Sequence, residues 1–445
     1  MLRVKVVLCL TVLAACLSVV VPVAKEHEEM SVAITNVRIF DGDQMIPDGT
    51  VVITGRTISH VGKEKKIPEG AEVIDGAGAT LLPGLIDSHA HDSGFGVERA
   101  LIFGVTTELE MFGDTEVARF IREQEAVDGA PMWASLITAG ILATAPGGHG
   151  TQYGLPIPTL TSPDQAQGWV DDRIAEGSDF IKIVLEDGSP YGFRVPFPTL
   201  DRATFAGVVD AAHRRHTLAV AHISEQSYAM LAIEENADAL VHIFTDVMPS
   251  SEFIELAAAR KVFVVPTLTV TESTAGVGSG ESLTYDPRLT PYLTPEEIDN
   301  LRAHFPNRGN LTMDGARAAV AGLHAAGVPI LAGTDTPNLG TAWGVSMHRE
   351  MEMLVDVGLT PIEALRAATS VPADAFRLKD RGRIKTGLRA DLILVSGDPE
   401  IDITTTRDIV RVWKLGNEVV RTPVSGTTSV AMQKRFELGR ASDSH

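Results

Sequence analysis

The sequence predicts an α/β protein in which a (β/α)8 TIM-like barrel carries a small β-sandwich domain built from both chain ends. Between about residues 84 and 375, apolar runs alternate with helical patterns, which is typical of repeated βα units and a parallel sheet. Residues 31–80 and 390–421 instead contain short β-like runs separated by turn residues. The 445 residues suffice for a barrel of ~250 residues and a smaller companion domain.

These patterns divide the chain into parts. We assign residues 84–375 to the barrel, and residues 31–83 together with 376–425 to the composite β-sandwich domain. Residues 1–24 form a leader, and residues 426–445 form a C-terminal tail. The two strand-rich ends of the chain are therefore expected to pair beside the barrel.

Eight apolar runs in the barrel region are candidate strands. Helical patterns separate them, as expected for successive βα units. The eight runs span residues 81–89, 105–111, 132–140, 179–185, 217–223, 238–244, 261–267 and 328–334.

Helical segments between these runs include residues 203–215, 252–261 and 314–326. The sequence Thr360-Pro-Ile-Glu363 is a capping box with proline at the first helical position, so it predicts the start of another helix. Residues 271–310 form the longest stretch without a regular pattern, and we expect them to cross one face of the barrel.

The leader has the features of an export signal. Arg3 and Lys5 precede residues 6–24, which contain no charged side chain. A basic start followed by an apolar run predicts a secretory signal, and its length would also allow an uncleaved membrane anchor. The sequence Leu-Ala-Ala-Cys ending at Cys16 resembles a bacterial lipobox. We expect a secreted or periplasmic protein, and whether the leader is cleaved, lipidated or retained stays open.

The composition restricts the partners of the chain. With 58 acidic and 38 basic residues, the formal net charge is −20, which disfavours nucleic acid and anionic lipid surfaces. A small-molecule substrate fits this charge, and a homo-oligomer stays open. Both cysteines, Cys9 and Cys16, lie in the leader, so a catalytic metal must be held by nitrogen and oxygen ligands.

The first candidate strand ends in two histidines that can share a metal ion. Residues 81–92 have the sequence LLPGLIDSHAHD. Side chains alternate along a strand, so His89 and His91 project from the same face. The C-terminal ends of parallel barrel strands are where such folds place their chemistry.

Four later polar residues lie on or at the ends of other candidate strands. Lys182 interrupts the apolar run 179–185, His222 and His242 end the fifth and sixth runs, and Asp335 follows the eighth. A salt bridge could satisfy the lysine, and a core hydrogen bond could satisfy a single histidine. Carbamylation of Lys182 by carbon dioxide would instead make it a carboxylate-like bridge between two metals.

Together these residues predict metal-assisted hydrolysis. Imidazoles mixed with hard oxygen ligands favour zinc, with manganese or cobalt as substitutes. Two ions sharing six ligands would leave open positions for a bridging hydroxide, whose formation the metals promote. His149 lies in a glycine-rich loop after the third candidate strand, where its ring could approach a substrate.

The chain resembles the amidohydrolase superfamily, in its binuclear type with a carboxylated lysine. The matching motifs are PGLIDSHAHD, GSDFIKI, AGTD and the tail RGRIKTGLRADLILVSGDP at 381–399. They extend over roughly residues 31–420, and the sequence is most similar to the imidazolonepropionase-like and prolidase-like group, which includes ochratoxinase-like amidases.

The resemblance implies a role for each site residue. One metal would be bound by His89, His91 and Asp335, the second by His222 and His242, with carbamylated Lys182 bridging the two. Asp335 would move the proton from a metal-bridging hydroxide to the leaving amine. His149 would hold the substrate or its oxyanion.

The substrate pocket departs from that of the dipeptidases in the group. Phe244 follows His242 where glycine is usual, so we expect Phe244 to narrow the mouth of a pocket that His149 and Trp343 also border. This predicts a bulky or aryl amide. The alternatives are a carbamate or urea, a dipeptide, a lactone or phosphotriester, and a non-catalytic relative that keeps the fold as a scaffold.

Overall fold

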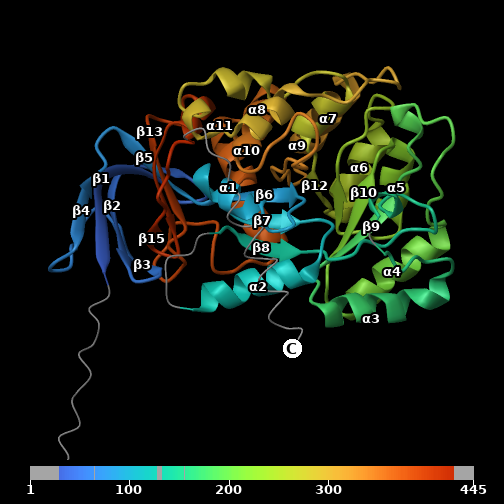
Figure 1. Cartoon of the computed structure of the whole chain (residues 1–445), viewed down its shortest axis with the longest axis horizontal. Helices are drawn as coiled ribbons and strands as arrows, with labels where there is room; N and C mark the ends of the chain where they lie inside the picture. The colour runs from blue at the N-terminus through green and yellow to red at the C-terminus, as the bar shows by residue number, and fades with distance from the viewer. Residues whose placement is uncertain (1–29, 65, 128–132, 155, 425–445) are drawn as a thin grey trace, which may run out of the picture.

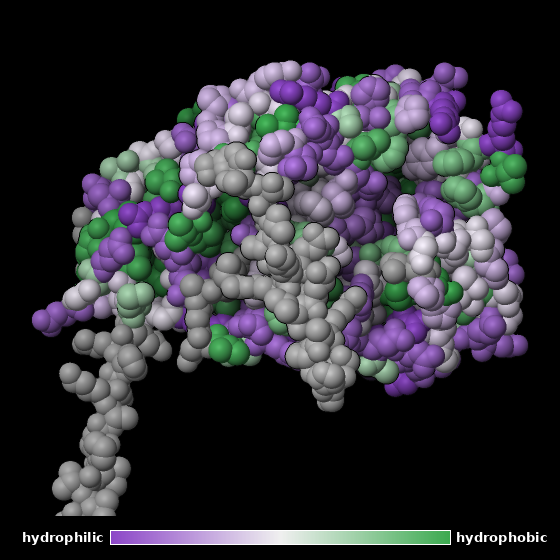
Figure 2. Space-filling model, viewed as in Figure 1, coloured by the Kyte–Doolittle hydropathy of each residue, from purple (hydrophilic) through white to green (hydrophobic). Residues whose placement is uncertain are grey.

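The computed structural model describes residues 30–64, 66–127, 133–154 and 156–424. The leader, both cysteines and the tail 426–445 lie outside these ranges. Within them, we find no helix with the length and apolar character needed to cross a membrane. Hydrophilic residues cover much of the face in Figure 2, and apolar residues gather there in separate patches, some of them over the β-domain.

Strands from both ends of the chain form one sheet. Figure 1 shows the blue strands of the chain start beside the red strands of its end. The sheet has eight strands in the order β15-β14-β13-β5-β1-β2-β3, with β4 paired to β1. Their bounds are Ser31–Phe40 (β1), Met45–Thr54 (β2), Thr57–Gly62 (β3), Glu72–Asp75 (β4), Ala79–Pro83 (β5), Leu392–Ser396 (β13), Ile409–Lys414 (β14) and Asn417–Glu418 (β15).

The junction between the two chain ends is the antiparallel pair of β5 and β13. Leu81 lies opposite Leu394 in this pair. Hydrogen bonds connect all eight strands into a single sheet rather than the two facing sheets that we expected of a sandwich. Its buried cluster draws on both ends, with Ile34 and Ile53 beside Leu392 and Trp413.

The barrel region contains two parallel sheets that together hold seven strands. The first has the order β6-β7-β8 and the second β12-β11-β10-β9. The strands are Leu85–Ala90 (β6), Val105–Glu110 (β7), Ser135–Thr138 (β8), Ile181–Leu185 (β9), Ala219–Ile223 (β10), Ala239–Val241 (β11) and Phe263–Val265 (β12). Six of these strands lie within predicted runs, and β6 extends one residue beyond the end of the first run.

The eighth predicted run does not form a regular strand. Isolated parallel bridges join Val264 to Ile330 and Ala90 to Thr336, and another joins Ile183 of β9 to Ala143 in the segment after β8. Pro329 lacks an N–H to donate, and Asp335 has a left-handed backbone (φ 57°), so an extended ladder is interrupted at both ends of the run. The segment still lies against β6.

The helices follow the strands as βα units require. Predicted helices 203–215, 252–261 and 314–326 are confirmed, and the capping box at Thr360 is formed. The helices are Gly96–Ile102 (α1), Thr115–Ala126 (α2), Ala166–Glu176 (α3), Arg202–Arg214 (α4), Gln226–Glu234 (α5), Ser251–Arg260 (α6), Leu268–Thr274 (α7), Pro295–Arg302 (α8), Asp314–Ala325 (α9), Val345–Asp356 (α10), Pro361–Ala367 (α11) and Ser370–Ala375 (α12).

The expectation of an irregular segment at 271–310 is wrong in part. Helix α8 lies inside it and begins with a complete capping box of Thr294 and Glu297. The sequence Thr-Pro-Glu-Glu at 294–297 has the same capping-box pattern as residues 360–363, so a signal for the start of this helix was present. The helix has only one fully buried apolar residue, Leu301, and its apolar periodicity is therefore weak.

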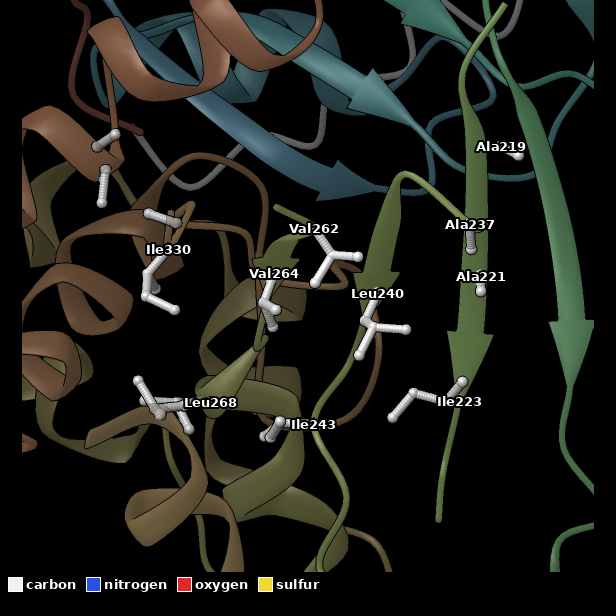
Figure 3. Packing of buried hydrophobic residues seen from close by; sticks show 14 of the residues in the cluster. Ala219, Ala221, Ile223, Ala237, Leu240, Ile243, Val262, Val264, Leu268 and Ile330 are labelled. Carbon is white, nitrogen blue, oxygen red and sulfur yellow. The ribbon is translucent and has the colours of Figure 1, made fainter. Parts of the chain in front are cut away.

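Alternation along the strands separates two buried layers. On β10, Ala219, Ala221 and Ile223 belong to the layer that also includes residues of the surrounding helices, as Figure 3 shows from close by. Val220 belongs to the other layer, and His222 shares its side of the strand. The inner face of the strand therefore ends in a functional side chain.

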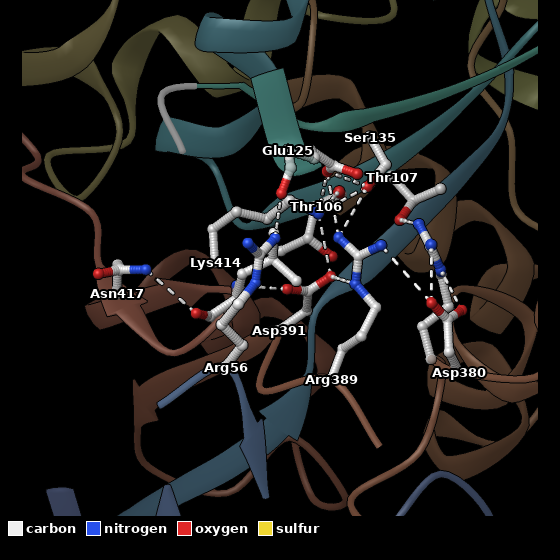
Figure 4. A network of polar contacts seen from close by, with 12 residues as sticks. Arg56, Thr106, Thr107, Glu125, Ser135, Asp380, Arg389, Asp391, Lys414 and Asn417 are labelled. Atoms are coloured by element: carbon white, nitrogen blue, oxygen red, sulfur yellow. Dashed lines mark hydrogen bonds and ion pairs between the residues drawn. The ribbon is translucent and has the colours of Figure 1, made fainter. Parts of the chain in front are cut away.

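A buried polar network joins the β-domain to the barrel region (Figure 4). Lys414 on β14 is fully buried, and its Nζ lies 3.0 Å from Asp391 Oδ2 and 2.7 Å from Ser135 Oγ of β8. Arg389 contacts Asp391 and also Glu125 of α2. Burial opposes ionisation of Asp391, but the charges of Lys414 and Arg389 outweigh it and lower its pKa to about 2.

We expect Asp391→Ala to lower the free energy of unfolding by about 3–5 kcal/mol, because it leaves the buried Lys414 charge without its closest carboxylate. Glu72→Ala is the matched control, since it breaks the exposed pair with Arg411 and should cost about 1 kcal/mol or less. Both are measured by urea denaturation. Because the pKa of Asp391 is lowered on folding, its contribution to the free energy of unfolding is complete above its ordinary pKa of 3.8 and is lost as the pH falls towards about 2. The difference in the free energy of unfolding between wild type and variant should therefore shrink in that pH range.

Candidate active site

Four of the predicted metal ligands, carried by β6, β9 and the segments that follow β6 and the eighth run, lie close together. His89 on β6 places its Nε2 3.2 Å from Lys182 Nζ of β9 and 3.2 Å from Asp335 Oδ1. His91, just after β6, places its Nε2 3.0 Å from the same aspartate oxygen. Asp335 Oδ1 is buried, yet neither imidazole meets hydrogen-bond geometry with it. Lys182 Nζ and His89 Nε2 are hydrogen-bonded, whereas Asp335 Oδ1 has no hydrogen-bond partner among the described residues.

The other two predicted ligands lie beside this group. His222 lies near the C-terminal end of β10, and His242 directly follows β11. Their ring centroids are 4.5 Å apart. The centroid of His242 lies 4.6 Å from that of His89. The structure therefore brings together all six residues that the sequence predicted as ligands.

Strained backbone conformations shape this end of the barrel region. His242, Thr267 and Asp335 all have positive φ angles, of 67°, 48° and 57°. Such conformations cost of order 1 kcal/mol or more in a residue with a side chain, and they concentrate at functional sites. Here they turn the chain sharply where strand side chains reach the cavity.

Asp87 fixes the eighth segment against β6. Its carboxylate accepts hydrogen bonds from the backbone N–H of His89 and of Thr334, at 3.0 Å each, and from Thr334 Oγ1 at 2.6 Å. Gly333 allows the close approach, since a Cβ there would lie 2.8 Å from the backbone nitrogen of His89. Burial raises the pKa of Asp87 to about 7 although these hydrogen bonds oppose it.

Burial also sets the protonation of the candidate ligands. It lowers the pKa of His89 to about 3 and that of His222 to about 4, so both rings are neutral near pH 7 and keep a lone pair. Burial opposes protonation of His91 as well, but Asp335 and Glu110 outweigh it and raise its pKa to about 9. The pKa of Lys182 falls to about 8, which makes its neutral, nucleophilic amine accessible.

A cavity of about 700 Å³ opens over these residues. Five of the six candidate ligands line it, and so does His149. Six aromatic side chains line the rest of the cavity, together with aliphatic and polar ones. The rings that line it belong to Phe112, Tyr153, Tyr191, Phe193, Phe197 and Phe305.

The sequence analysis missed one residue of the site, Glu186. It directly follows β9, is buried, and contacts His149 Nδ1 at 3.1 Å and His222 Nε2 at 2.5 Å. The sequence contained a signal, because Glu186 directly follows the run 179–185 and lies four residues after Lys182. An even spacing along a strand puts both side chains on the same face. Among the described residues, two groups of side chains are compact enough to hold a metal: His89, His242 and Asp335, and His149, Glu186 and His222.

The expectation for Phe244 is wrong. Its side chain is fully buried, packs against Phe253 of α6 with ring centroids 5.0 Å apart, and does not line the cavity. Its neighbours Ile243 and Thr245 line the cavity instead. The left-handed turn at His242 ends the strand alternation, so the sequence position alone could not say which side Phe244 would face.

Trp343 also differs from its predicted role. Its indole N–H donates to the backbone carbonyl of His91 at 3.2 Å, and its ring lies so close to Gly96 that a Cβ there would be 2.2 Å away. Trp343 is absent from the cavity wall and supports the loop that carries His91. His348 of α10 is buried away from the cavity with both ring nitrogens bonded, to Thr406 and to the carbonyl of Phe103.

An α/β fold with histidines, a lysine and an aspartate gathered at strand ends is typical of metal-dependent hydrolases. Residues 80–428 match the amidohydrolase family, and the chain belongs to that family, as its motifs predicted.

Known proteins of several activities are similar to the chain. An imidazolonepropionase from Anaeromyxobacter sp. (strain K) is 28% identical over 386 residues, which cover 80% of this chain and 86% of that protein. Solved structures with the same fold include a Xaa-Pro dipeptidase (TM-score 0.70, 23% identity, 87% of this chain and 99% of that one). They also include A. niger ochratoxinase, with a TM-score of 0.68 and 22% identity over 88% of this chain and 96% of that one. Phenylurea hydrolase B has a TM-score of 0.65 and 20% identity over 90% of this chain and 100% of that one. These likenesses imply a TIM-barrel-like α/β fold with a second domain.

We expect Phe244→Ala to lower the free energy of unfolding by about 3–5 kcal/mol, because it removes a fully buried ring from the core. Phe197→Ala is the control, since this half-buried ring lines the cavity and its loss should cost about 1 kcal/mol or less. Chemical denaturation of both variants measures the difference. Equal losses would contradict the assignment of Phe244 to the core.

Proposed function

We propose that the chain is an exported, metal-dependent hydrolase that cleaves the C–N bond of a bulky or aryl amide. The observation that carries this proposal is the set of ionisable side chains at one end of the cavity, together with the aromatic wall beyond them. Family membership supports hydrolysis, and the imidazolonepropionase relative and the dipeptidase and phenylurea hydrolase structures support action on C–N bonds.

The donor set fits two divalent ions, for which zinc is our first candidate. His89, His91 and Asp335 would hold one ion, and His222 and His242 the other, with carbamylated Lys182 between them. The unbonded Asp335 oxygen near two imidazoles supports this, because such buried polar atoms call for a further partner. When bound, the ions supply Lewis acidity for the attack on the scissile group.

The protein's own residues would handle the proton and the substrate. Burial opposes ionisation of Asp335, but the imidazoles of His89 and His242 hold its pKa well below the ordinary value, so it is an ionised carboxylate near pH 7. In that form it would take up a proton from the attacking water molecule. It would then deliver that proton to the leaving nitrogen. His149, on the cavity wall, would contact the carbonyl oxygen of the substrate.

The aromatic wall supports the substrate class. The rings of Phe193 and Phe197 are 4.9 Å apart, and Phe197 also contacts His149 edge-on. Aromatic pairs of this kind favour flat or bulky apolar groups. This wall replaces Phe244 as the reason to expect an aryl or otherwise bulky substrate.

A second candidate is a dipeptidase. Arg308 lines the cavity, and its guanidinium has no ion-pair partner among the described side chains. An arginine there could bind the carboxylate of a dipeptide. The similarity to a Xaa-Pro dipeptidase supports this alternative.

Two further expectations also stay proposals. We infer that the barrel strands close into a (β/α)8 ring, which the isolated bridges at Ile183, Ile330 and Thr336 support. We also infer export through residues 1–24, from their basic and apolar pattern.

We expect Lys182→Ala to bind at least one metal equivalent less than wild type and to lose turnover, because the bridge between the ions is gone. Metal content is measured by elemental analysis, and ¹³C-bicarbonate NMR should show a carbamate signal in wild type alone. Exposed Lys379→Ala is the control and should keep metals, signal and turnover. A Lys182→Ala protein with full metal content and turnover would rule out the bridging role.

A substrate panel tests the reaction class. The zinc-loaded protein is assayed with aryl amides, phenylureas and aryl carbamates, Xaa-Pro dipeptides, lactones and phosphotriesters. We expect aryl amides to have the highest kcat/KM, and Phe197→Ala to raise their KM about tenfold through lost ring contact. A preference for dipeptides, with KM raised by Arg308→Gln, would replace the proposal by the second candidate.

A further inference from the structure

We propose that Glu186 is a positioning residue that holds a metal ligand and a substrate-contacting histidine at once. One carboxylate oxygen would fix His222 with its Nδ1 turned to the second metal, and the other would fix His149 on the cavity wall. This inference rests on the proposed function, because it assumes that His222 binds a metal and that His149 meets the substrate.

Each oxygen of Glu186 has its own histidine. Oε2 lies 2.5 Å from His222 Nε2, and Oε1 lies 3.1 Å from His149 Nδ1. The Glu186 side chain is only 3% exposed, and the two rings lie with centroids 4.8 Å apart. A buried carboxylate without partners would be strongly unfavourable, and here two imidazoles supply them.

The short contact to His222 is a hydrogen bond rather than shared metal ligation through these atoms. Ligand atoms at about 2.0–2.2 Å from a tetrahedral zinc are roughly 3.4 Å from each other. The separation of 2.5 Å between Glu186 Oε2 and His222 Nε2 is too short for that arrangement. Nε2–H of His222 therefore donates to Glu186, which leaves the lone pair on Nδ1.

The second ligand of the same metal has the opposite arrangement. His242 Nδ1 lies 2.8 Å from Thr267 Oγ1, so its Nε2 is the nitrogen left for a metal. Histidine ligands usually bond through their other nitrogen to a carboxylate, carbonyl or hydroxyl-like partner, which fixes the ring orientation. Glu186 and Thr267 supply such partners to two neighbouring ligands.

His149 depends more on Glu186 than His222 does. His222 is held on strand β10, whereas His149 lies in a loop with Gly148 before it and Gly150 after it, and Gly150 has φ 99°. Its ring also lies edge-on to Tyr153 and Phe197 and beside the ring of His222. Among the described residues, Glu186, which directly follows β9, is the ion-pair partner that fixes this ring.

The test uses Glu186→Gln, which keeps the shape but has one acceptor oxygen and cannot accept from both rings. We expect zinc affinity, measured by chelator competition without substrate, to fall by about 10–100-fold, with two equivalents still bound at saturation. Glu363→Gln is the control, because it removes a carboxylate beside surface His324, retains the helix cap and should change neither value.

A double-mutant cycle tests the link to His149. Glu186→Gln and His149→Ala should each lower kcat, and the double variant should be no slower than the slower single variant, because Glu186 acts on turnover through that ring. His149→Ala should leave zinc affinity unchanged.

Three results would overturn the proposal: unchanged zinc affinity in Glu186→Gln, loss of a whole zinc equivalent at saturation, or additive effects on kcat. The second would make Glu186 a ligand. A wild-type protein that binds two zinc ions but hydrolyses nothing would count against the proposed function alone, since the affinity test needs no substrate. A protein that binds no zinc would overturn both.

Discussion

The site depends on one buried carboxylate that ties together distant parts of the chain. Asp87 accepts three hydrogen bonds, two of them from Thr334, which is 247 residues further along the chain. These bonds hold the segment before Asp335 against the strand that carries His89, although this segment forms no regular ladder. Backbone hydrogen bonds from Ser88 N–H to the Ala332 carbonyl and from Asp335 N–H to the His89 carbonyl add to this attachment. The candidate metal centre is therefore held together in part by a side chain that does not itself face the cavity.

Most of the correct predictions came from the alternation of side chains along strands and from the polar residues at strand ends. The seven strands of the barrel region match predicted runs to within one residue. His89, His222, His242 and Asp335 meet because parallel strands end at the same edge, and the side chain of Lys182 reaches them from within β9. The β-domain joined the two chain ends as expected, but as one sheet, since strand texture does not reveal which edges pair. The eighth strand was misjudged because hydrophobicity does not reveal how a proline and a left-handed aspartate interrupt hydrogen bonding.

Two of the differences at the site concern residues just past a strand end. Beyond the ends of their strands, at Phe244 and Glu186, alternation is no longer a reliable guide. At His242 the backbone turns left-handed and sends Phe244 into the core. After β9 the alternation persists, and Glu186 arrives beside two histidines. Local pattern could not distinguish these outcomes, because each is decided by backbone angles that only the packed structure sets.

The pairing of β5 with β13 has a consequence for the order of folding. Strand β5 leads directly into β6, the first strand of the barrel region. The strand that pairs with β5, β13, comes after the whole barrel region in the sequence. Until residue 396 is available, β5 exposes an unpaired apolar edge next to the nascent metal site. Such long-range closure favours slow assembly, and a chain cut before β13 would present that edge to other molecules.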